Sequence, residues 1–360
     1  MKLMKRSLII FTILTVAALL GITVIYPSIL RAIHRIEAPG IDLMETVEIG
    51  GIPQVLYTRG QNRDNPVILF LHGGPGFPTM PFLHDFQYAW EPYFTIVHWD
   101  QRNSGRTFHL SDPAEIVETL SFEQVLSDAY EVTQHIRAML AVDTITIMGY
   151  SWGSVLGAAL VQNHPYYFNA YIGVGQVVNM IQNEQLGFEA LLEEVLARGN
   201  ENHLQEVKAL APWPPNRYFD EEFIAHLFEV RQWQVRYGLA TGGELGFVWN
   251  IMTSPYYSIR ERLQLARINP YDHLPLFQFL FDQFDLRHFG THFEQPVFFL
   301  SGDRDFQTPY ELARDFLEEV TAPHRAFFLI PDAGHGAMHD NPAVFNDILL
   351  HEIRPFLIEE

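Results

Sequence analysis

The sequence of 360 residues contains no cysteine and has few basic residues. The lack of cysteine excludes disulfide bonds, thiol catalysis and cysteine-ligated zinc sites, although it does not fix the redox compartment. Lys and Arg number 23 against 43 Asp and Glu, which gives a formal net charge of −20. Because phosphate contacts need clustered Lys and Arg, this balance argues against binding to nucleic acid. The sequence also shows no internal repeat and no low-complexity segment.

One long apolar run is present, close to the N-terminus. No residue from Ser7 to Leu30 is charged, and the part up to Tyr26 is nearly all apolar. About 20 helical residues span the hydrocarbon core of a bilayer. Three basic residues precede the run, which favours a cytoplasmic N-terminus and a body outside the cytoplasm. We therefore predict a membrane anchor over residues 1–35. Secretion after signal cleavage is the alternative, but no good A-x-A-like site follows the run.

The remainder alternates between strand-like and helix-like segments. After a connector over residues 27–40, residues 44–60 read as a hairpin around Gly50 and Gly51. Short apolar runs near residues 66–72, 93–100, 143–150 and 168–176 read as strands, and residues 121–140 and 152–164 as helices. This rhythm predicts an α/β fold with a mostly parallel, doubly wound sheet. The fold class we expect is an α/β-hydrolase fold with a helical cap and an N-terminal transmembrane helix.

The alternation stops between residues 177 and 293, where no convincing buried strand occurs. This stretch contains Trp213, Trp233 and Trp249, and it reads as helices and loops. We interpret it as a helical cap inserted into a core formed by residues 36–176 and 294–360. The aromatic residues are expected to form the cap's own core for the most part.

A candidate nucleophile follows one of the predicted strands. In the stretch "IMGYSWGSVLG", Ser151 has Gly149 and Gly153 two places away on each side. This spacing is typical of a sharp strand-to-helix turn that exposes a serine at the top of an α/β sheet. A serine hydroxyl becomes a good nucleophile only when a base takes its proton. If Ser151 is the nucleophile, the chain must also supply a base, an acid and an oxyanion hole.

The expected acid lies after a later strand, in "SGDRDFQTP". Asp305 is three residues past Gly302 and can point back over the sheet, so we favour it over Asp303. Asp303 directly follows the glycine and is expected to form the turn. Asp332 is too close to the candidate base on the same loop to orient it easily.

The expected base is His335, in "PDAGHGAMH" after the last predicted strand. The resulting chain order, serine then aspartate then histidine, is that of α/β-hydrolases. His339 lies four residues further on, a spacing that metals also favour, but nothing nearby supplies a third ligand, so we predict no metal site. His72 precedes a glycine turn and is expected to be structural.

Two backbone N–H groups should form the oxyanion hole. One is expected from Trp152, directly after the nucleophile, at a helix N-terminus. The other is expected from the loop "LHGGPG", where Gly73 and Gly74 permit a close approach of the backbone. We favour the amide of Gly74, with Gly73 as the alternative. A GxSxG motif alone is a weak signal, but the ordered combination of motifs at strand ends is a strong one.

Three motifs together, "HGGPG", "WDQRNSGRT" and "GYSWGS", resemble the proline iminopeptidase group of α/β-hydrolases. The resemblance covers about residues 45–176 and 294–358. It implies a triad of Ser151, Asp305 and His335, and an oxyanion hole from the HGGPG loop and Trp152. It also implies a helical cap over the site and no metal or organic cofactor.

The sequence departs from this group at several positions. Asn103 and Tyr150 stand where the group usually or often has glycine. The group places cap acids against the substrate's free amino group, and Glu184 and Glu244 are weak candidates for that role here. We also expect Asp100 and Arg102 to form an ion pair that braces the HGGPG loop.

These features lead to three functional hypotheses. The first is a membrane-tethered aminopeptidase that removes N-terminal residues, including proline, from short peptides. The second is a carboxylesterase or other small-acyl hydrolase that uses the same triad. The third is a binding module that has lost catalysis, which the complete set of site candidates disfavours. Dehalogenase and epoxide hydrolase chemistry is disfavoured because it requires a carboxylate at position 151. The oligomeric state cannot be predicted from the sequence.

Overall fold

The computed structural model describes residues 2–216, 219–240, 244–265 and 269–358. Its centre is an eight-stranded sheet in the order β1-β2-β4-β3-β5-β6-β7-β8. The pairs β1·β2 and β2·β4 are antiparallel, and all other neighbours are parallel. The strands are β1 (Ile41–Ile49), β2 (Ile52–Gly60), β3 (Val67–Leu71), β4 (Thr95–Asp100), β5 (Ile145–Tyr150), β6 (Phe168–Val174), β7 (Val297–Gly302) and β8 (Arg325–Ile330). The predicted mostly parallel α/β sheet and its N-terminal hairpin are confirmed.

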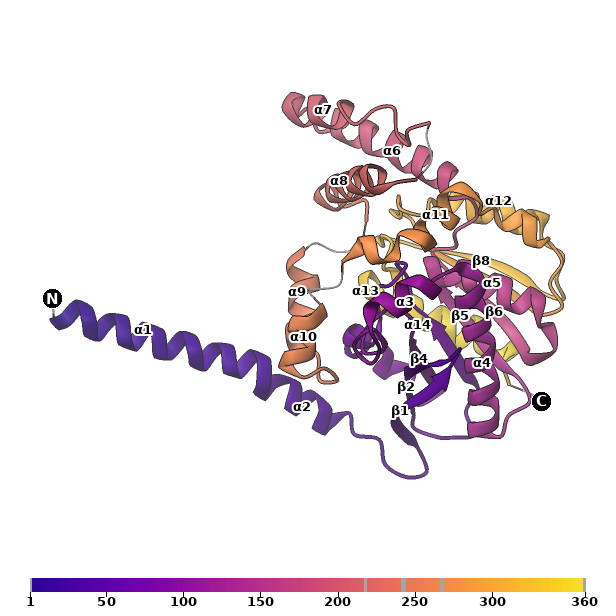
Figure 1. Ribbon diagram of the computed structural model, residues 1–360, viewed down its shortest axis with the longest axis horizontal. Coiled ribbons are helices and arrows are strands. Elements are labelled where there is room, and N and C mark those ends of the chain that lie inside the picture. Colours follow the sequence, from indigo (N-terminus) through magenta and orange to yellow (C-terminus); the bar gives the residue numbers. More distant parts are fainter. Residues whose placement is uncertain (1, 217–218, 241–243, 266–268, 359–360) are drawn as a thin grey trace.

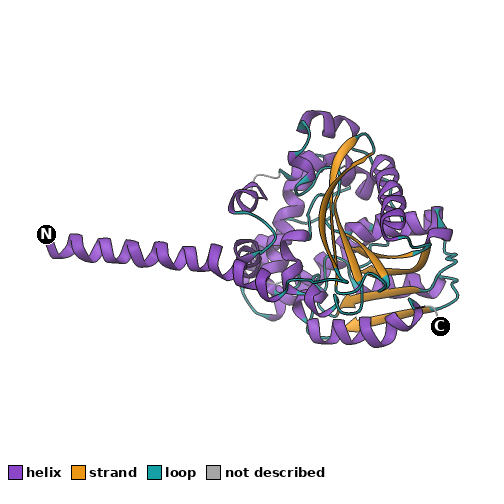
Figure 2. Cartoon of the chain, turned by 90° about the horizontal axis from the view of Figure 1, so that it is seen from below, coloured by secondary structure: helices purple, strands orange, loops and turns teal. Residues whose placement is uncertain are grey.

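Helices cover both faces of this sheet, as Figures 1 and 2 show. One apolar core packs the sheet against α4 (Phe122–Leu140), α5 (Trp152–Asn163) and α12 (Tyr310–Glu319). A second core, on the other face, includes residues of the turn η2 (Met80–Asp85), α13 (Ala337–Asp340), α14 (Pro342–Asp347) and the π-helical segment η8 (Ile348–Ile353). A short helix, α3 (Pro113–Thr119), precedes α4.

The strand β3 shows how the sequence divides these two cores. All five of its residues are buried, and successive side chains alternate between the faces. Leu69 and Leu71 belong to the first core, and Ile68 and Phe70 to the second. A strand with no polar residue is what a sheet covered on both faces requires.

Between β6 and β7 the chain forms a helical insertion. Its helices are α6 (Met180–Ala197), α7 (Glu201–Lys208), α8 (Glu221–Tyr237), α9 (Glu244–Thr253), α10 (Ile259–Leu265) and α11 (Leu274–Asp282), with turns η6 (Pro270–His273) and η7 (Leu286–Phe289). The two ends of the insertion meet, because Leu286 N–H donates to the carbonyl of Val178 over 2.8 Å. Figure 1 shows α6–α8 stacked together and α9–α10 beside the N-terminal helix.

The N-terminal helix is continuous through α1 (Lys2–Leu20), the π-helical segment η1 (Gly21–Ile25) and α2 (Tyr26–Ile33). Its first part projects from the body in both views (Figures 1 and 2). The stretch Ile10–Ile33, with a mean hydropathy of 2.2, is long and apolar enough to cross a membrane. The expected connector over residues 27–40 is wrong in its first half, because the helix continues to Ile33 and packs against the body.

Candidate active site

Ser151 occupies a sharp turn between β5 and α5. Its backbone has φ 54° and ψ −120°, a conformation that non-glycine residues rarely adopt. A Cβ at Gly149 would lie 2.4 Å from the carbonyl oxygen of Gly153, and a Cβ at Gly153 only 2.0 Å from that of Leu71. The two glycines therefore allow the helix to start directly against the sheet. The turn has the geometry that exposes a nucleophile in this class of sheet.

Asp305 and His335 lie in contact at the neighbouring strand ends. Nδ1 of His335 is 2.9 Å from Oδ2 of Asp305, and both side chains are buried. Asp305 also accepts hydrogen bonds from the N–H groups of Gln307 and Thr308 and from Oγ1 of Thr308. Because an ionised carboxylate can only accept, Nδ1 carries the proton and Nε2 is the acceptor of the ring. The carboxylate is thus fixed in position, and it orients the imidazole.

Two residues connect this pair with the turn at Ser151. The N–H of Ser151 donates to the carbonyl of Val174, and the next residue, Gly175, has φ +55°. A Cβ at Gly175 would lie 3.2 Å from Cε1 of His335 and 3.3 Å from Oδ2 of Asp305. The ring of Tyr150 lies 5.1 Å from that of His335, centroid to centroid. The serine, aspartate and histidine therefore gather at the carboxyl ends of β5, β7 and β8.

The HGGPG loop faces the serine from β3. A Cβ at Gly73 would lie 3.2 Å from Cβ of Ser151, and Gly74 has φ +118°. Trp152 is the first residue of α5, so its N–H has no acceptor within the helix. The amides proposed for an oxyanion hole thus come from two segments on either side of Ser151.

A hydrogen-bond chain fixes the position of this loop. The two ring nitrogens of His72 contact the carbonyl of Gly73 and Oγ of Ser104, each at 2.9 Å. Gln101 donates to the carbonyl of His72 and accepts from Nε1 of Trp152. Burial lowers the pKa of His72 to about 4, so the ring is neutral at pH 7. The chain joins the loop to the first residue of α5.

The expected ion pair between Asp100 and Arg102 is wrong. The guanidinium of Arg102 instead makes two hydrogen bonds to Asp128 on α4, at 2.8 and 2.9 Å. Asp100 accepts from the N–H of Arg106 and from the hydroxyl of Tyr257, and burial raises its pKa to about 6. Asp100 ends β4 and Arg102 lies in the turn that follows, so their side chains take partners on different elements.

The helical insertion lies directly on the HGGPG loop. A Cβ at Gly76 would fall within 1.9 Å of the ring of His273, so only glycine leaves room for this ring. His273 is buried, and its two ring nitrogens have no hydrogen-bond partner among the described residues. Nδ2 of Asn103 donates to the carbonyl of Asp272 over 3.0 Å. The departure from glycine at position 103 thus provides a contact between the insertion and the loop region.

The candidate cap acids have different environments. Glu184 on α6 is buried. It accepts a hydrogen bond from Nε1 of Trp213 and forms an ion pair with Arg231 on α8. Its charge is therefore already compensated, which disfavours a role in holding a substrate's amino group. Glu244 begins α9, and its side chain lies outside the described residues.

The histidines rejected as bases have other partners. Nδ1 of His339 lies 2.7 Å from Oδ2 of Asp85. Across residues 2–216, 219–240, 244–265 and 269–358, no group of three or more His, Asp or Glu side chains is placed to hold a metal ion. Asp303 lies in the turn after Gly302, as expected, and its side chain accepts from the N–H of Ala333.

Three residues of this site were missed from the sequence. Thr308 contacts Asp305 and lies 3.3 Å from Nδ1 of His335, Tyr150 packs on the imidazole, and Gly175 makes room for it. Thr308 had a detectable signal, because an aspartate side chain in a turn commonly accepts hydrogen bonds from the backbone a few residues further along the chain. The other two depend on the packing of separate strands.

Comparison with known proteins shows the family to which the chain belongs. A model of the alpha/beta hydrolase family matches residues 68–348. The chain is 26% identical over 323 residues to the probable aminopeptidase YbaC of Bacillus subtilis, covering 89% of this chain and 99% of that protein. It is 33% identical to the proline iminopeptidase of Neisseria gonorrhoeae over 120 residues, which is 33% of this chain and 35% of that enzyme. The resemblance inferred from the three motifs is confirmed.

A solved structure has the same fold. The proline iminopeptidase-related protein from Thermus thermophilus superimposes with a TM-score of 0.58 at 21% identity, over 88% of this chain and 99% of that one. At this identity the likeness establishes the fold, and function must be argued from the site.

Proposed function

Because the chain belongs to the alpha/beta hydrolase family, we propose that it is a serine hydrolase with a triad of Ser151, His335 and Asp305. The observation that carries the proposal is the contact of 2.9 Å between His335 and Asp305, next to the strained turn of Ser151. The side chains come from three separate strand ends. A fold without catalysis has no need to bring them together.

The proposed mechanism has two steps. Nε2 of His335 takes the proton of the Ser151 hydroxyl as the oxygen attacks the acyl carbon of the substrate. The negative oxygen that forms accepts hydrogen bonds from the N–H groups of Trp152 and Gly74, with Gly73 as the alternative donor. The imidazolium then protonates the leaving amine or alcohol, which departs. In the second step a water molecule, deprotonated by His335, attacks the acyl-enzyme. The carboxylic acid product is released and the Ser151 hydroxyl is restored. Asp305 orients the imidazole and stabilises its charged form throughout.

We propose an aminopeptidase that acts on N-terminal residues of short peptides as the first candidate. Its support is the match to the probable aminopeptidase YbaC, which extends over most of both chains. In this proposal residues 177–293 form a cap over a core of residues 36–176 and 294–360. Because η6 lies on the HGGPG loop, the cap admits only small substrates to the site.

A carboxylesterase or related small-acyl hydrolase is the second candidate. The observation that favours it is the environment of Glu184, whose carboxylate is already held by Arg231 and Trp213. A peptide's free amino group carries a positive charge that requires an unpaired acid in the site, whereas an ester has no such group.

For location, we propose that residues 1–35 anchor the protein in a membrane with the body outside the cytoplasm. The support is the apolar helix of Ile10–Ile33 and the basic residues that precede it. Secretion after cleavage of this segment is the alternative.

The full chain in detergent tests the function directly. Prolyl and alanyl p-nitroanilides should be assayed beside short p-nitrophenyl esters, for the natural chain and for Ser151→Ala. We expect Ser151→Ala to lose turnover of every substrate with an unchanged circular dichroism spectrum. Efficient ester turnover without anilide cleavage would replace the aminopeptidase with the esterase. Full turnover by Ser151→Ala would show that the nucleophile is another residue.

A fluorophosphonate probe supplies an independent control. It should label the natural chain once, and peptide mass spectrometry should place the label on Ser151. The His335→Gln variant keeps a ring-sized polar side chain but cannot accept a proton, so its labelling should be much slower. Labelling of the natural chain on a different serine would contradict the proposed triad.

A further inference from the structure

The C-terminal part of the N-terminal helix, from η1 to the end of α2, is fixed to the body at two points. The first point is Arg262 of α10, whose Nη1 donates to the carbonyl of Thr23 in η1 over 2.8 Å. The same side chain is buried and also donates to the carbonyl of Tyr257. Beside it the rings of Tyr26 and Trp249 pack with centroids 6.3 Å apart. The helix thus contacts both α9 and α10 where η1 passes into α2.

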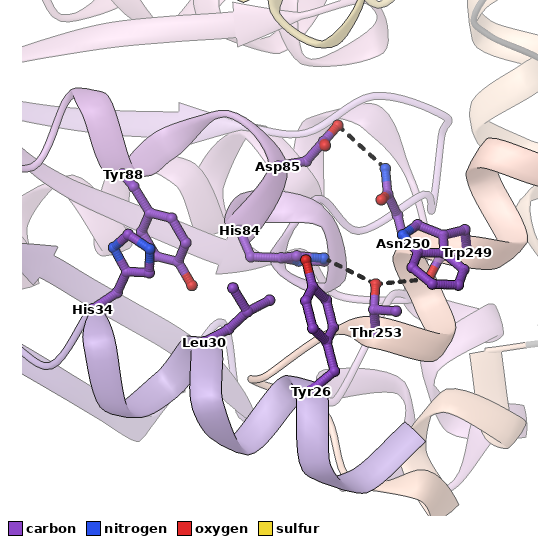
Figure 3. A pocket seen from close by; sticks show the side chains of 9 residues that line it. All are labelled: Tyr26, Leu30, His34, His84, Asp85, Tyr88, Trp249, Asn250 and Thr253. Carbon is purple, nitrogen blue, oxygen red and sulfur yellow. Dashed lines mark hydrogen bonds between the residues drawn. The ribbon is translucent and has the colours of Figure 1, made fainter. Parts of the chain in front are cut away.

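The second point lies at the end of α2. The ring of His34 stacks on Tyr88 with centroids 3.5 Å apart, and its carbonyl accepts from Nη2 of Arg59. Arg59 is buried and pairs with Glu91 of the body. Between the two points lies a cavity of about 210 Å³, into which Leu30 points from α2 (Figure 3). The helix is therefore held to the body at both ends of α2.

The position of these contacts along the helix can be compared with the thickness of a bilayer. An α-helix rises 1.5 Å per residue, and a hydrocarbon core about 30 Å thick takes about 20 residues. Counted from Ser7, the first residue after the N-terminal charges, such a span ends near Tyr26. Thr23 then lies about 4.5 Å inside that end. An element bonded to Thr23 cannot stand clear of the lipid.

The elements at this level expose apolar side chains. Val248 on α9 and Leu263 on α10 are 53% and 60% exposed. Trp249, next to Val248, and Ile259, one turn before Leu263, are exposed as well. Exposed apolar groups on neighbouring helices mark contact surfaces, and Trp and Tyr are typical of the membrane interface. Three exposed arginines lie on the same helices or just beyond them, Arg31, Arg35 and Arg260. Their charges can pair with anionic headgroups at the membrane surface.

We propose that Val248, Trp249, Ile259 and Leu263 form a bilayer-contact face, which rests in the headgroup region of the membrane that α1 spans. This proposal rests on the proposed membrane anchor. The occupant of the face is the lipid surface itself. Because Arg262 and Arg59 fix the helix, the face meets the membrane in one orientation, with α9 and α10 held against the bilayer.

The absence of cysteine makes a single-site labelling test possible. The full chain is reconstituted in vesicles of phosphatidylcholine and phosphatidylglycerol, with the fluorophore NBD on one introduced cysteine. Leu263→Cys probes the bilayer-contact face. Leu196→Cys is the matched control, because Leu196 is 62% exposed but lies on α6. Leu14→Cys, in α1, reports whether the anchor has inserted at all.

We expect vesicles with doxyl-labelled lipid to quench the labels at positions 14 and 263 by about twofold or more, and the label at 196 hardly at all. Quenching at 14 with none at 263 would overturn the bilayer-contact face and leave the anchor intact. Absence of quenching at both would overturn the anchor and the face together. A blue-shifted but unquenched label at 263 would mean that a second copy covers the face, which also contradicts the proposal. Ester or anilide turnover of each labelled chain verifies that it is folded.

Discussion

Gly73 and Ser151 lie so close that a methyl group at position 73 would be 3.2 Å from Cβ of the serine. They are separated by 78 residues in the sequence, and the contact joins the end of β3 to the end of β5. This relationship leads to the first prediction.

The Gly73→Ala variant should lose activity and keep its fold. Gly73 does not have a positive φ, so alanine is tolerated by the backbone, while its methyl group crowds Ser151, the proposed nucleophile. We expect kcat/KM to fall about tenfold to a hundredfold, since displacements of 1 Å at a site cost that much. Gly51→Ala is the control, because Gly51 has φ +76° and open space around it, so it should lose some stability and no activity. Equal activity of Gly73→Ala and the natural chain would show that the serine is approached from elsewhere.

Replacing Thr308 tests the support of the acid. Thr308→Val keeps the shape of the side chain but removes the hydrogen bond of 2.8 Å to Oδ2 of Asp305. We expect kcat to fall about tenfold with little change in KM, because the carboxylate orients His335 less firmly. Thr308→Ser should restore most of the loss. If the valine and serine variants had the same kcat, the hydroxyl would have no positioning role.

The pH dependence of stability should carry a signature of Asp100. Burial raises the pKa of this carboxyl from 3.8 to about 6, so the folded chain holds the proton more tightly than the unfolded chain. Stability from this group is therefore greatest in acid and declines as the pH rises from about 4 to about 6. Asp100→Asn lacks this decline. The difference in unfolding free energy, variant minus natural chain, should grow by about 2 kcal/mol from pH 4 to pH 7.

Urea denaturation at closely spaced pH values, followed by fluorescence, measures this difference. Taking the difference between the two chains removes the titration of the other groups. A difference that stays constant from pH 4 to pH 7 would mean that Asp100 titrates near its ordinary pKa. The Asp112→Asn variant is a useful comparison, because Asp112 is exposed at the N-terminus of α3.

Glu184→Gln separates a structural role from substrate binding. The buried carboxylate accepts from Arg231 and Trp213, and removing its charge leaves the guanidinium largely unpaired. We expect a loss of about 3 kcal/mol in unfolding free energy, with KM for anilide and ester substrates changed equally little. A selective rise of KM for substrates with a free amino group, at unchanged stability, would instead identify Glu184 as the amine ligand.

The sequence was most informative where local chemistry determines structure. The helix predicted over residues 121–140 is present as α4, and the side chain of Ser121 accepts from the N–H of Gln124 at its start. The strands near Ser151, Asp305 and His335 were predicted because apolar runs end in glycine or polar residues there. The order of those motifs also indicated the family, which the comparisons confirmed.

It was least informative where partners are distant in the chain. Arg102 pairs with Asp128, on a helix 26 residues away, and no local pattern distinguishes it from the nearer Asp100. His273 covers Gly76 from the insertion, across almost 200 residues. The continuation of the N-terminal helix through α2 was missed because Pro27 reads as a boundary. Proline is nevertheless accepted in the first turn of a helical segment, and Pro27 is buried against the body.

The packing of α2 on the body bears on how this protein could be released in soluble form. A protease that cut before η1 would leave Tyr26 packed on Trp249 and His34 stacked on Tyr88. A cut after residue 35 would strip that cover away and expose aromatic rings to water. A shed enzyme should therefore retain a short helical stub at its new N-terminus, and trimming the chain further should produce aggregation.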